Sequence, residues 1–163
     1  MKLIVISDTN GERSWIQKAL DLHPDADVVV HCGDFASDLE SIKGAPLEMV
    51  SVMGNVMDLH AGLVPPESRV EERLLIYEGV RILLTHGHRY DVKHTLNKLF
   101  YRALEAQADL VLFGHTHVAL SLEHQGVSFL NPGSPARPRG GRPGYGIVEV
   151  QEGAFTCKLF TFS

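Results

Sequence analysis

The feature that most constrains this chain is a series of short apolar runs, each of which ends near a polar side chain. Runs of this length, rich in Val, Ile and Leu, are typical of strands that are buried on both faces of a sheet. Because the carboxyl ends of parallel strands line the ligand crevice of an open α/β sheet, we expect the polar residues that follow the runs to share one site. In chain order they are Asp8, Asp34, Asn55, His86, His115 and His117.

The hydrophobic pattern predicts a mixed α/β chain. Strands are expected over residues 2–6, 27–30, 48–52, 69–77, 80–85, 109–113, 118–124, 127–130, 145–150 and 155–162. Amphipathic helices are expected around residues 15–20 and 92–104, with a short helix at 37–43. Residues 131–144 hold four Pro and four Gly, but only one hairpin follows them, and a hairpin does not fold alone. We therefore interpret this segment as an internal loop, and residues 1–163 as a single domain.

Composition excludes several classes of function. With 44% hydrophobic residues and a formal net charge of −5, the 163-residue chain lacks the basic field that nucleic-acid binding requires. No apolar run is long enough for a signal peptide or a membrane span. The two cysteines, Cys32 and Cys157, lie too far apart in sequence to suggest a disulfide framework. We expect a cytoplasmic protein with no membrane partner, and a homo-oligomer stays open.

The polar set at the strand ends favours a metal site. Carboxylates, imidazoles and an amide oxygen suit divalent Mn, Fe, Co, Ni or Zn. Six ligands are too many for one tetrahedral ion, so two ions that share a carboxylate are the expected count. Each residue alone has a plain structural explanation, because Gly-Asp and Gly-Asn are common turn dipeptides. The ordered set is what indicates a function.

In order and spacing, these motifs resemble those of the calcineurin-like metallophosphoesterases, and most closely the small YfcE-type phosphodiesterase branch. The likeness covers essentially the whole chain and rests on Asp8, Gly33-Asp34, Gly54-Asn55, Thr85-His86-Gly87-His88, Gly114-His115-Thr116-His117 and Asn131-Pro132-Gly133-Ser134. It implies a four-layer α/β/β/α sandwich, in which two mixed sheets are flanked by helices. It also implies a divalent-metal-dependent phosphodiesterase that hydrolyses a small phosphate ester. The nucleophile would be a hydroxide that bridges two ions, and Mn²⁺ is the expected metal.

The same resemblance implies a role for each matching residue. Asp34 would bridge the two ions, and Asn55 would also orient a phosphate oxygen. His88 would donate to the phosphate or protonate the leaving group. The first ion would take Asp8 and His117, and the second would take Asn55, His86 and His115.

Two motifs depart from the family pattern. Asn10 stands where the first motif normally has His, so it is either a weaker metal ligand or the N-cap of the first helix. Val56 follows Asn55 and cannot donate a proton, which favours esters with good leaving groups or help from a loop histidine such as His60. The alternatives are a non-catalytic scaffold of the same fold, or an enzyme with a single ion.

Several further residues have plain expectations. Cys32 and His31 should be buried beside the second motif, and His94 should lie on an exposed helix face. The three arginines of the 131–144 loop either screen phosphate charge or form an ordinary exposed loop; they are Arg137, Arg139 and Arg142.

Overall fold

A computed structural model describes residues 1–42, 44–56 and 69–163 of the chain. In the first part of the chain the elements are β1 (Lys2–Ile6), α1 (Ser14–Leu22), β2 (Val28–His31), the 3-10 helix η1 (Ala36–Ile42) and β3 (Glu48–Ser51). The rest are β4 (Glu72–Tyr77), β5 (Val80–Thr85), the 3-10 turn η4 (His88–Tyr90), α2 (Asn97–Glu105), β6 (Leu110–Leu112), β7 (Leu120–His124), β8 (Val127–Asn131), β9 (Gly144–Gln151) and β10 (Ala154–Thr161).

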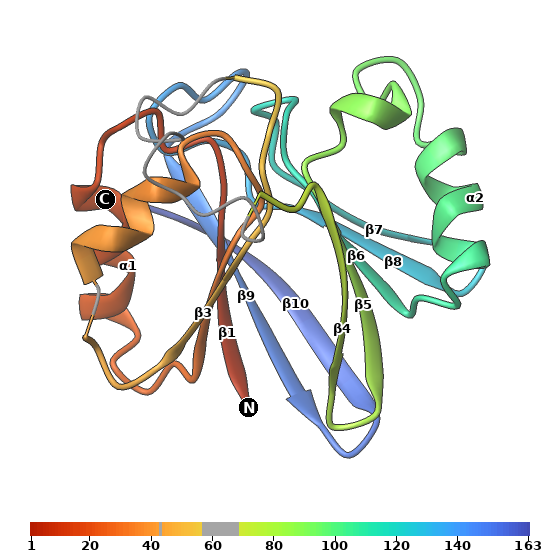
Figure 1. Ribbon diagram of the computed structural model, residues 1–163, viewed down its shortest axis with the longest axis horizontal. Helices are drawn as coiled ribbons and strands as arrows, with labels where there is room; N and C mark the ends of the chain where they lie inside the picture. Colours follow the sequence, from red (N-terminus) through yellow and green to blue (C-terminus); the bar gives the residue numbers. More distant parts are fainter. Residues whose placement is uncertain (43, 57–68) are drawn as a thin grey trace.

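The strands form two five-stranded mixed sheets (Figure 1). The first has the order β10-β9-β1-β2-β3, and the second has the order β4-β5-β6-β8-β7. In the first sheet β1, β2 and β3 are parallel, whereas β9 and β10 run antiparallel. In the second sheet β5, β6 and β8 are parallel, and the edge strands β4 and β7 are antiparallel. The parallel strands of each sheet therefore deliver the loops after them to one edge.

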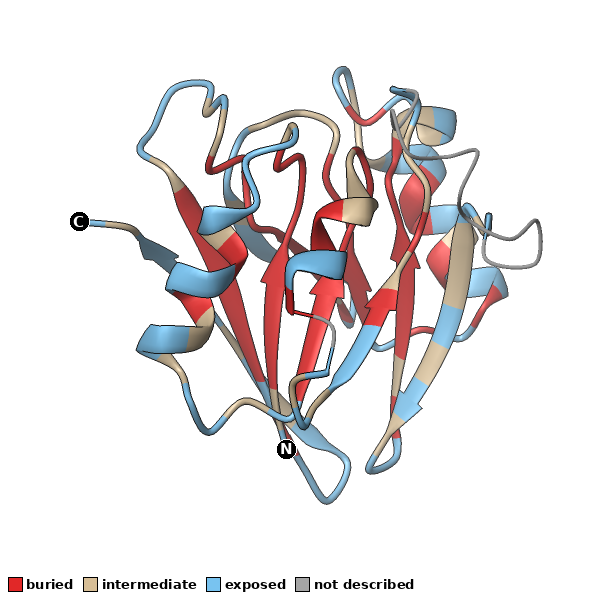
Figure 2. Cartoon of the chain, turned by 60° about the vertical axis from the view of Figure 1, so that its left-hand side comes forward, coloured by how far each residue is buried: buried red, intermediate tan, exposed pale blue. Residues whose placement is uncertain are grey.

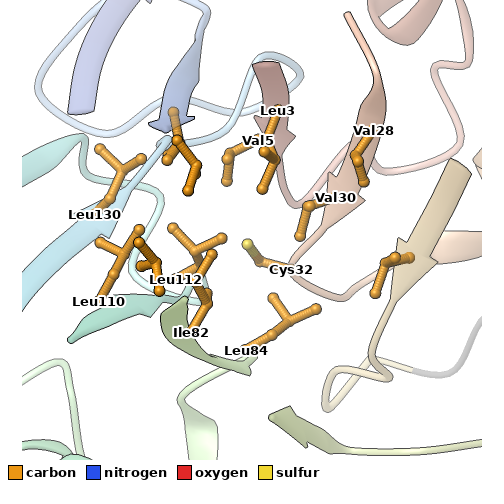
Figure 3. Close-up of a cluster of buried hydrophobic side chains, with 14 of the residues drawn as sticks. Leu3, Val5, Val28, Val30, Cys32, Ile82, Leu84, Leu110, Leu112 and Leu130 are labelled. Carbon is orange, nitrogen blue, oxygen red and sulfur yellow. The ribbon is translucent and has the colours of Figure 1, made fainter. Parts of the chain in front are cut away.

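Three layers of apolar side chains hold the sheets and helices together. Between the sheets, the side chains of β1 and β2 face those of β5, β6 and β8, with Cys32 among them (Figure 3). On the outer face of the first sheet, α1 and η1 pack over Ile4, Ile6 and Val29. On the outer face of the second sheet, α2 packs over Leu83 and Val111. Buried strands thus lie between partly exposed helices (Figure 2), and the expected four-layer sandwich is confirmed.

Most predicted elements are found, but the start of the second amphipathic helix is wrong. The prediction placed a helix over 92–104, whereas α2 begins at Asn97. Val92 and Leu96 lie in the turns before it, yet both pack into the same apolar layer as the helix. His94 consequently lies before α2, where it is exposed and contacts Asp91.

The other differences are small. β4 begins at Glu72 and β7 at Leu120, later than expected. Within the described residues, no helix has the length and apolar character needed to cross a membrane.

Candidate metal centre

Strand ends of both sheets bring the predicted residues to one place. β1 leads to Asp8 and β2 to Asp34 in the first sheet, while β5 leads to His86 in the second. Asn55 follows β3, and the loop after β6 carries His115 and His117. A pocket of about 390 Å³ opens here, lined among others by Asp8, Asn10, Asp34, Asn55, His115 and His117.

Several of these residues have a left-handed backbone. The φ angle is 53° at Asp8, 61° at Asp34, 71° at His115 and 61° at His117. Such a conformation costs about 1–3 kcal/mol for most residues that carry a Cβ, although Asp bears it more easily. Because four such residues occur at one pocket, we infer that the surrounding packing imposes this backbone conformation and so fixes the direction of their side chains.

The fully buried imidazole of His86 lies among oxygen atoms. Its Nδ1 donates to the carbonyl oxygen of Cys32 at 2.9 Å, so Nε2 is the nitrogen that faces the site. Nε2 lies 3.2 Å from Asp34 Oδ2 and 3.1 Å from Asn55 Oδ1. A nitrogen lone pair surrounded by oxygen lone pairs requires a cation, which is either a proton or a metal ion.

One carboxylate oxygen of Asp8 accepts hydrogen bonds, and the other accepts none from the described residues. Oδ2 accepts hydrogen bonds from the Ser7 hydroxyl and from the backbone N–H of His115. Oδ1 is buried and accepts no hydrogen bond from the described residues. It lies 3.2 Å from His117 Nε2 and 3.8 Å from His86 Nε2. A buried carboxylate oxygen without a donor is costly, and coordination of a cation would remove that cost.

These observations test whether the side chains fit a metal ion. One ligand atom each from Asp8, Asp34 and His86 lies within 4.8 Å of the others. His117 Nδ1 donates to the Arg137 carbonyl oxygen at 2.9 Å, which leaves Nε2 facing the site. A backbone carbonyl that fixes the imidazole in this way is the usual support for a metal-binding histidine. The described residues therefore fit a divalent ion.

The pKa values follow from these contacts. Burial opposes ionisation of Asp34, yet its hydrogen bond to His86 and the charge of that imidazole hold the carboxyl pKa below its usual value. Burial likewise opposes protonation of His86, but Asp34 and Asp8 raise its pKa. The Asp8 carboxylate raises the pKa of His117. Burial, and then the charge of His86, lower the pKa of His115 to about 4, which keeps that imidazole in the neutral form that binds metals.

The comparisons decide the family. Residues 1–153 match the calcineurin-like phosphoesterase superfamily domain. The chain belongs to this superfamily. The probable metallophosphoesterase YsnB of Bacillus subtilis (strain 168) is 35% identical over 163 residues, which cover 98% of this chain and 90% of YsnB. The phosphodiesterase YfcE of Escherichia coli (strain K12) is 27% identical over 175 residues, which cover 91% of this chain and 88% of YfcE.

A more distant likeness concerns the fold alone. The structure of wild-type Vps29 from Entamoeba histolytica, complexed with Zn²⁺, has a TM-score of 0.73. It covers 98% of this chain and 98% of Vps29, at 18% identity. The two chains thus share a fold, and the likeness gives no indication of activity.

One interpretation of Asn10, as the N-cap of the first helix, is wrong. α1 begins at Ser14, and its N-cap residue is Arg13, which makes no side-chain capping hydrogen bond. Asn10 instead has φ of 56° and lines the pocket. With its amide turned to satisfy both groups, its oxygen accepts from Arg137 Nε at 3.0 Å and Nη2 at 3.2 Å. The amide oxygen of Asn10 is therefore directed to a guanidinium.

His88 lies at the edge of the cluster. Its ring centroid is 5.4 Å from that of His86 and 6.1 Å from that of His115. Its Nδ1 is buried and has no hydrogen-bond partner among the described residues. Burial, and then the charge of His86, lower its pKa, which favours the neutral ring. His60, the other histidine considered as a proton donor, lies outside the described residues.

Motif reasoning missed the supports of the site. The Ser134 hydroxyl donates to the Asp8 carbonyl oxygen at 2.7 Å and accepts from the backbone N–H of Arg137 at 2.9 Å. The Asn131 amide donates to the Gly114 carbonyl oxygen at 3.0 Å. Lys93 also lines the pocket, although it belongs to none of the sequence motifs. Asn131 and Ser134 stand in a recognised motif, but nothing in that motif indicates that they contact other loops.

Proposed function

We propose that the protein is a divalent-metal-dependent phosphodiesterase that hydrolyses a small phosphate ester. The observation that carries this proposal is the orphaned oxygen Asp8 Oδ1, which lies beside Asp34 and two imidazoles in a pocket at the strand ends. Membership of the calcineurin-like phosphoesterase superfamily and a relative named as a phosphodiesterase support the same reaction class.

We propose two ion positions. Asp34 would contribute to both, Asp8 and His117 would hold the first ion, and the second would take Asn55, His86 and His115. Ions bound there would supply a nucleophilic water at neutral pH and would offset the charge of the phosphate. A side-chain general base is therefore not required.

The chain's own residues would bind and orient the ester. The Asn55 oxygen faces His86, which leaves its amide nitrogen to donate to a phosphate oxygen. Lys93, Arg137 and Arg139 line the pocket and would offset the negative charge of the ester. His88, which has one ring nitrogen unpartnered among the described residues, would donate a hydrogen bond to the phosphate.

The geometry of Asn10 favours a second candidate, an enzyme with a weak or vacant first ion position. An amide oxygen that accepts from Arg137 is not directed toward an ion. Asn10→His distinguishes the two: we expect higher activity at low metal concentration if the first ion takes part. One ion per chain in both the wild type and Asn10→His, with unchanged activity, would show that the site works with one ion.

The test of the proposed function is hydrolysis of bis(p-nitrophenyl) phosphate with and without Mn²⁺. We expect activity that depends on Mn²⁺ and falls at least 100-fold in Asp34→Asn and His115→Asn. Asparagine tolerates the left-handed backbone of both positions, so these variants keep the loop conformation. His124→Asn is the matched control, since His124 is exposed at the end of β7 and does not line the pocket.

Two results would contradict the proposal. One is hydrolysis that persists after chelation of all metal, and the other is full activity in both variants. A protein that binds Mn²⁺ through Asp34 but cleaves no phosphodiester would support the non-catalytic scaffold instead.

A further inference from the structure

We propose that a groove beside the metal centre binds an aromatic group of the ester, so that the substrate is a phosphodiester with one uncharged ring. This inference rests on the proposed function. The groove, hereafter the side groove, has a volume of about 470 Å³. Its apolar walls are Val92, Leu96, Phe113, Val118 and Leu120.

The side groove has a fixed floor and an open rim. Val92 is 7% exposed and Phe113 is 1% exposed, and both belong to the apolar layer that packs α2 against the second sheet. Val118, in contrast, is 47% exposed, although it is a large apolar residue. An apolar surface that is held rigid below and left open above is suited to a ligand group of matching shape.

The side groove adjoins the pocket at the strand ends. Lys93 and Arg139 line both. The backbone N–H of Arg139 donates to the carbonyl oxygen of His117 at 2.9 Å, which ties this boundary to a proposed metal ligand. Lys93 also lines the strand-end pocket together with His115. A phosphate in the pocket would therefore have its ester group at the entrance of the groove.

Charge identifies the kind of group that fits. The described residues that line the side groove include Lys93, His94 and Arg139 and no acidic residue. A cationic ester group would be repelled, whereas the phosphate itself belongs to the metal centre. An aromatic ring gains from the apolar walls, and its negative face also attracts cationic side chains at the rim. A nucleobase-sized or aryl ring is the occupant that satisfies both conditions.

The test compares phenylphosphonate with methylphosphonate, two non-hydrolysable phosphonates, at a pH above the second pKa of both so that they carry the same charge. Isothermal titration of the Mn²⁺-loaded protein should show phenylphosphonate binding about tenfold more tightly, as expected for partial burial of one ring. In Val118→Ser this ratio should fall to about threefold, with methylphosphonate affinity retained. Ile76→Ser is the matched control, because Ile76 is 59% exposed on β4 and should leave both affinities unchanged.

The outcomes separate the inference from the proposed function. Equal affinity for the two phosphonates, or an equal loss of both in Val118→Ser, overturns the side groove while the phosphoesterase proposal stands. If neither phosphonate binds the metal-loaded protein, both proposals fail. Tight phenylphosphonate binding that Val118→Ser does not alter places the ring elsewhere and also overturns the inference.

Discussion

Among single residues, Gly54 of the third motif shows how this motif can lie so close to the Asp34 carboxylate. A Cβ at Gly54 would lie 1.9 Å from Asp34 Oδ1 and 2.6 Å from the Asp34 backbone nitrogen. Asp34 is 7% exposed, and its Oδ1 also accepts from the backbone N–H of Val56. Only a residue without a Cβ lets the third motif approach the second, so Gly54 controls the position of a proposed metal ligand.

Gly54→Ala tests this control. We expect it to displace the Asp34 carboxylate, to lower the free energy of unfolding by about 1–3 kcal/mol and to weaken Mn²⁺ binding at least tenfold. Urea titration and calorimetry measure the two effects. Gly141→Ala is the control, because a Cβ there meets no atom within 4 Å and the position has no left-handed φ. Unchanged Mn²⁺ affinity in Gly54→Ala would argue against Asp34 as a ligand.

At the scale of elements, the loop after β1 is attached to η1 by a buried relay. The N–H of Gly33 donates to His31 Nδ1 at 3.1 Å, so His31 Nε2 donates to the Thr9 hydroxyl at 2.9 Å. That hydroxyl donates in turn to Asp38 Oδ2 at 2.7 Å. The N–H of Gly11 donates to the same carboxylate oxygen at 3.0 Å. These hydrogen bonds attach the loop that carries Asp8 and Asn10 to η1.

Asp38→Ala should loosen this loop. It removes the acceptor of the hydrogen bonds from Thr9 and Gly11 and the partner of the Arg13 guanidinium, so we expect a loss of about 2–4 kcal/mol of unfolding free energy. Asp21→Ala, which removes an exposed carboxylate that pairs with Gln17, should cost less than about 0.5 kcal/mol. Equal stability of the two variants in urea would show that the relay does not support the first motif.

A second attachment joins α2 to the edge strand β4. Arg102 donates to Glu72 Oε2 from Nε at 2.9 Å and from Nη2 at 2.8 Å, and the Tyr90 hydroxyl donates to Glu72 Oε1. We expect Glu72→Gln to cost about 1 kcal/mol in urea unfolding, since the group is partly exposed. Glu105→Gln is the control, because Glu105 lies 3.6 Å from the same guanidinium and is 72% exposed. A larger loss in the control would contradict this assignment.

The elements also show what the sequence could and could not predict. Strand ends were predictable because the apolar runs stop within three residues of Asp8, Asp34 and His86. The start of α2 was not, because turns place the buried Val92 and the partly buried Leu96 at helical spacing, and periodicity indicates burial but not hydrogen bonding. The contact between Ser134 and Asp8 joins residues 126 positions apart, which no local pattern reveals.

For the whole molecule, charge and stability are linked through the metal centre. Two bound dications would add four positive charges to a chain whose formal net charge is −5. Those charges would be concentrated in one pocket, whose rim already carries Lys93, Arg137 and Arg139. An acidic protein can in this way attract a small phosphate ester without attracting a nucleic-acid strand.

The same linkage predicts a metal-dependent stability. An ion that binds only the folded state at one hundred times its dissociation constant adds about 2.7 kcal/mol, which corresponds to a rise in Tm of roughly 5–10 °C for a chain of this size. We expect Mn²⁺ to produce this rise in the wild type and not in Asp34→Asn. Asp25→Asn, a change in an exposed carboxylate that pairs with Lys2, should keep the full rise. An equal rise in all three proteins would place the stabilising ion outside the strand-end pocket.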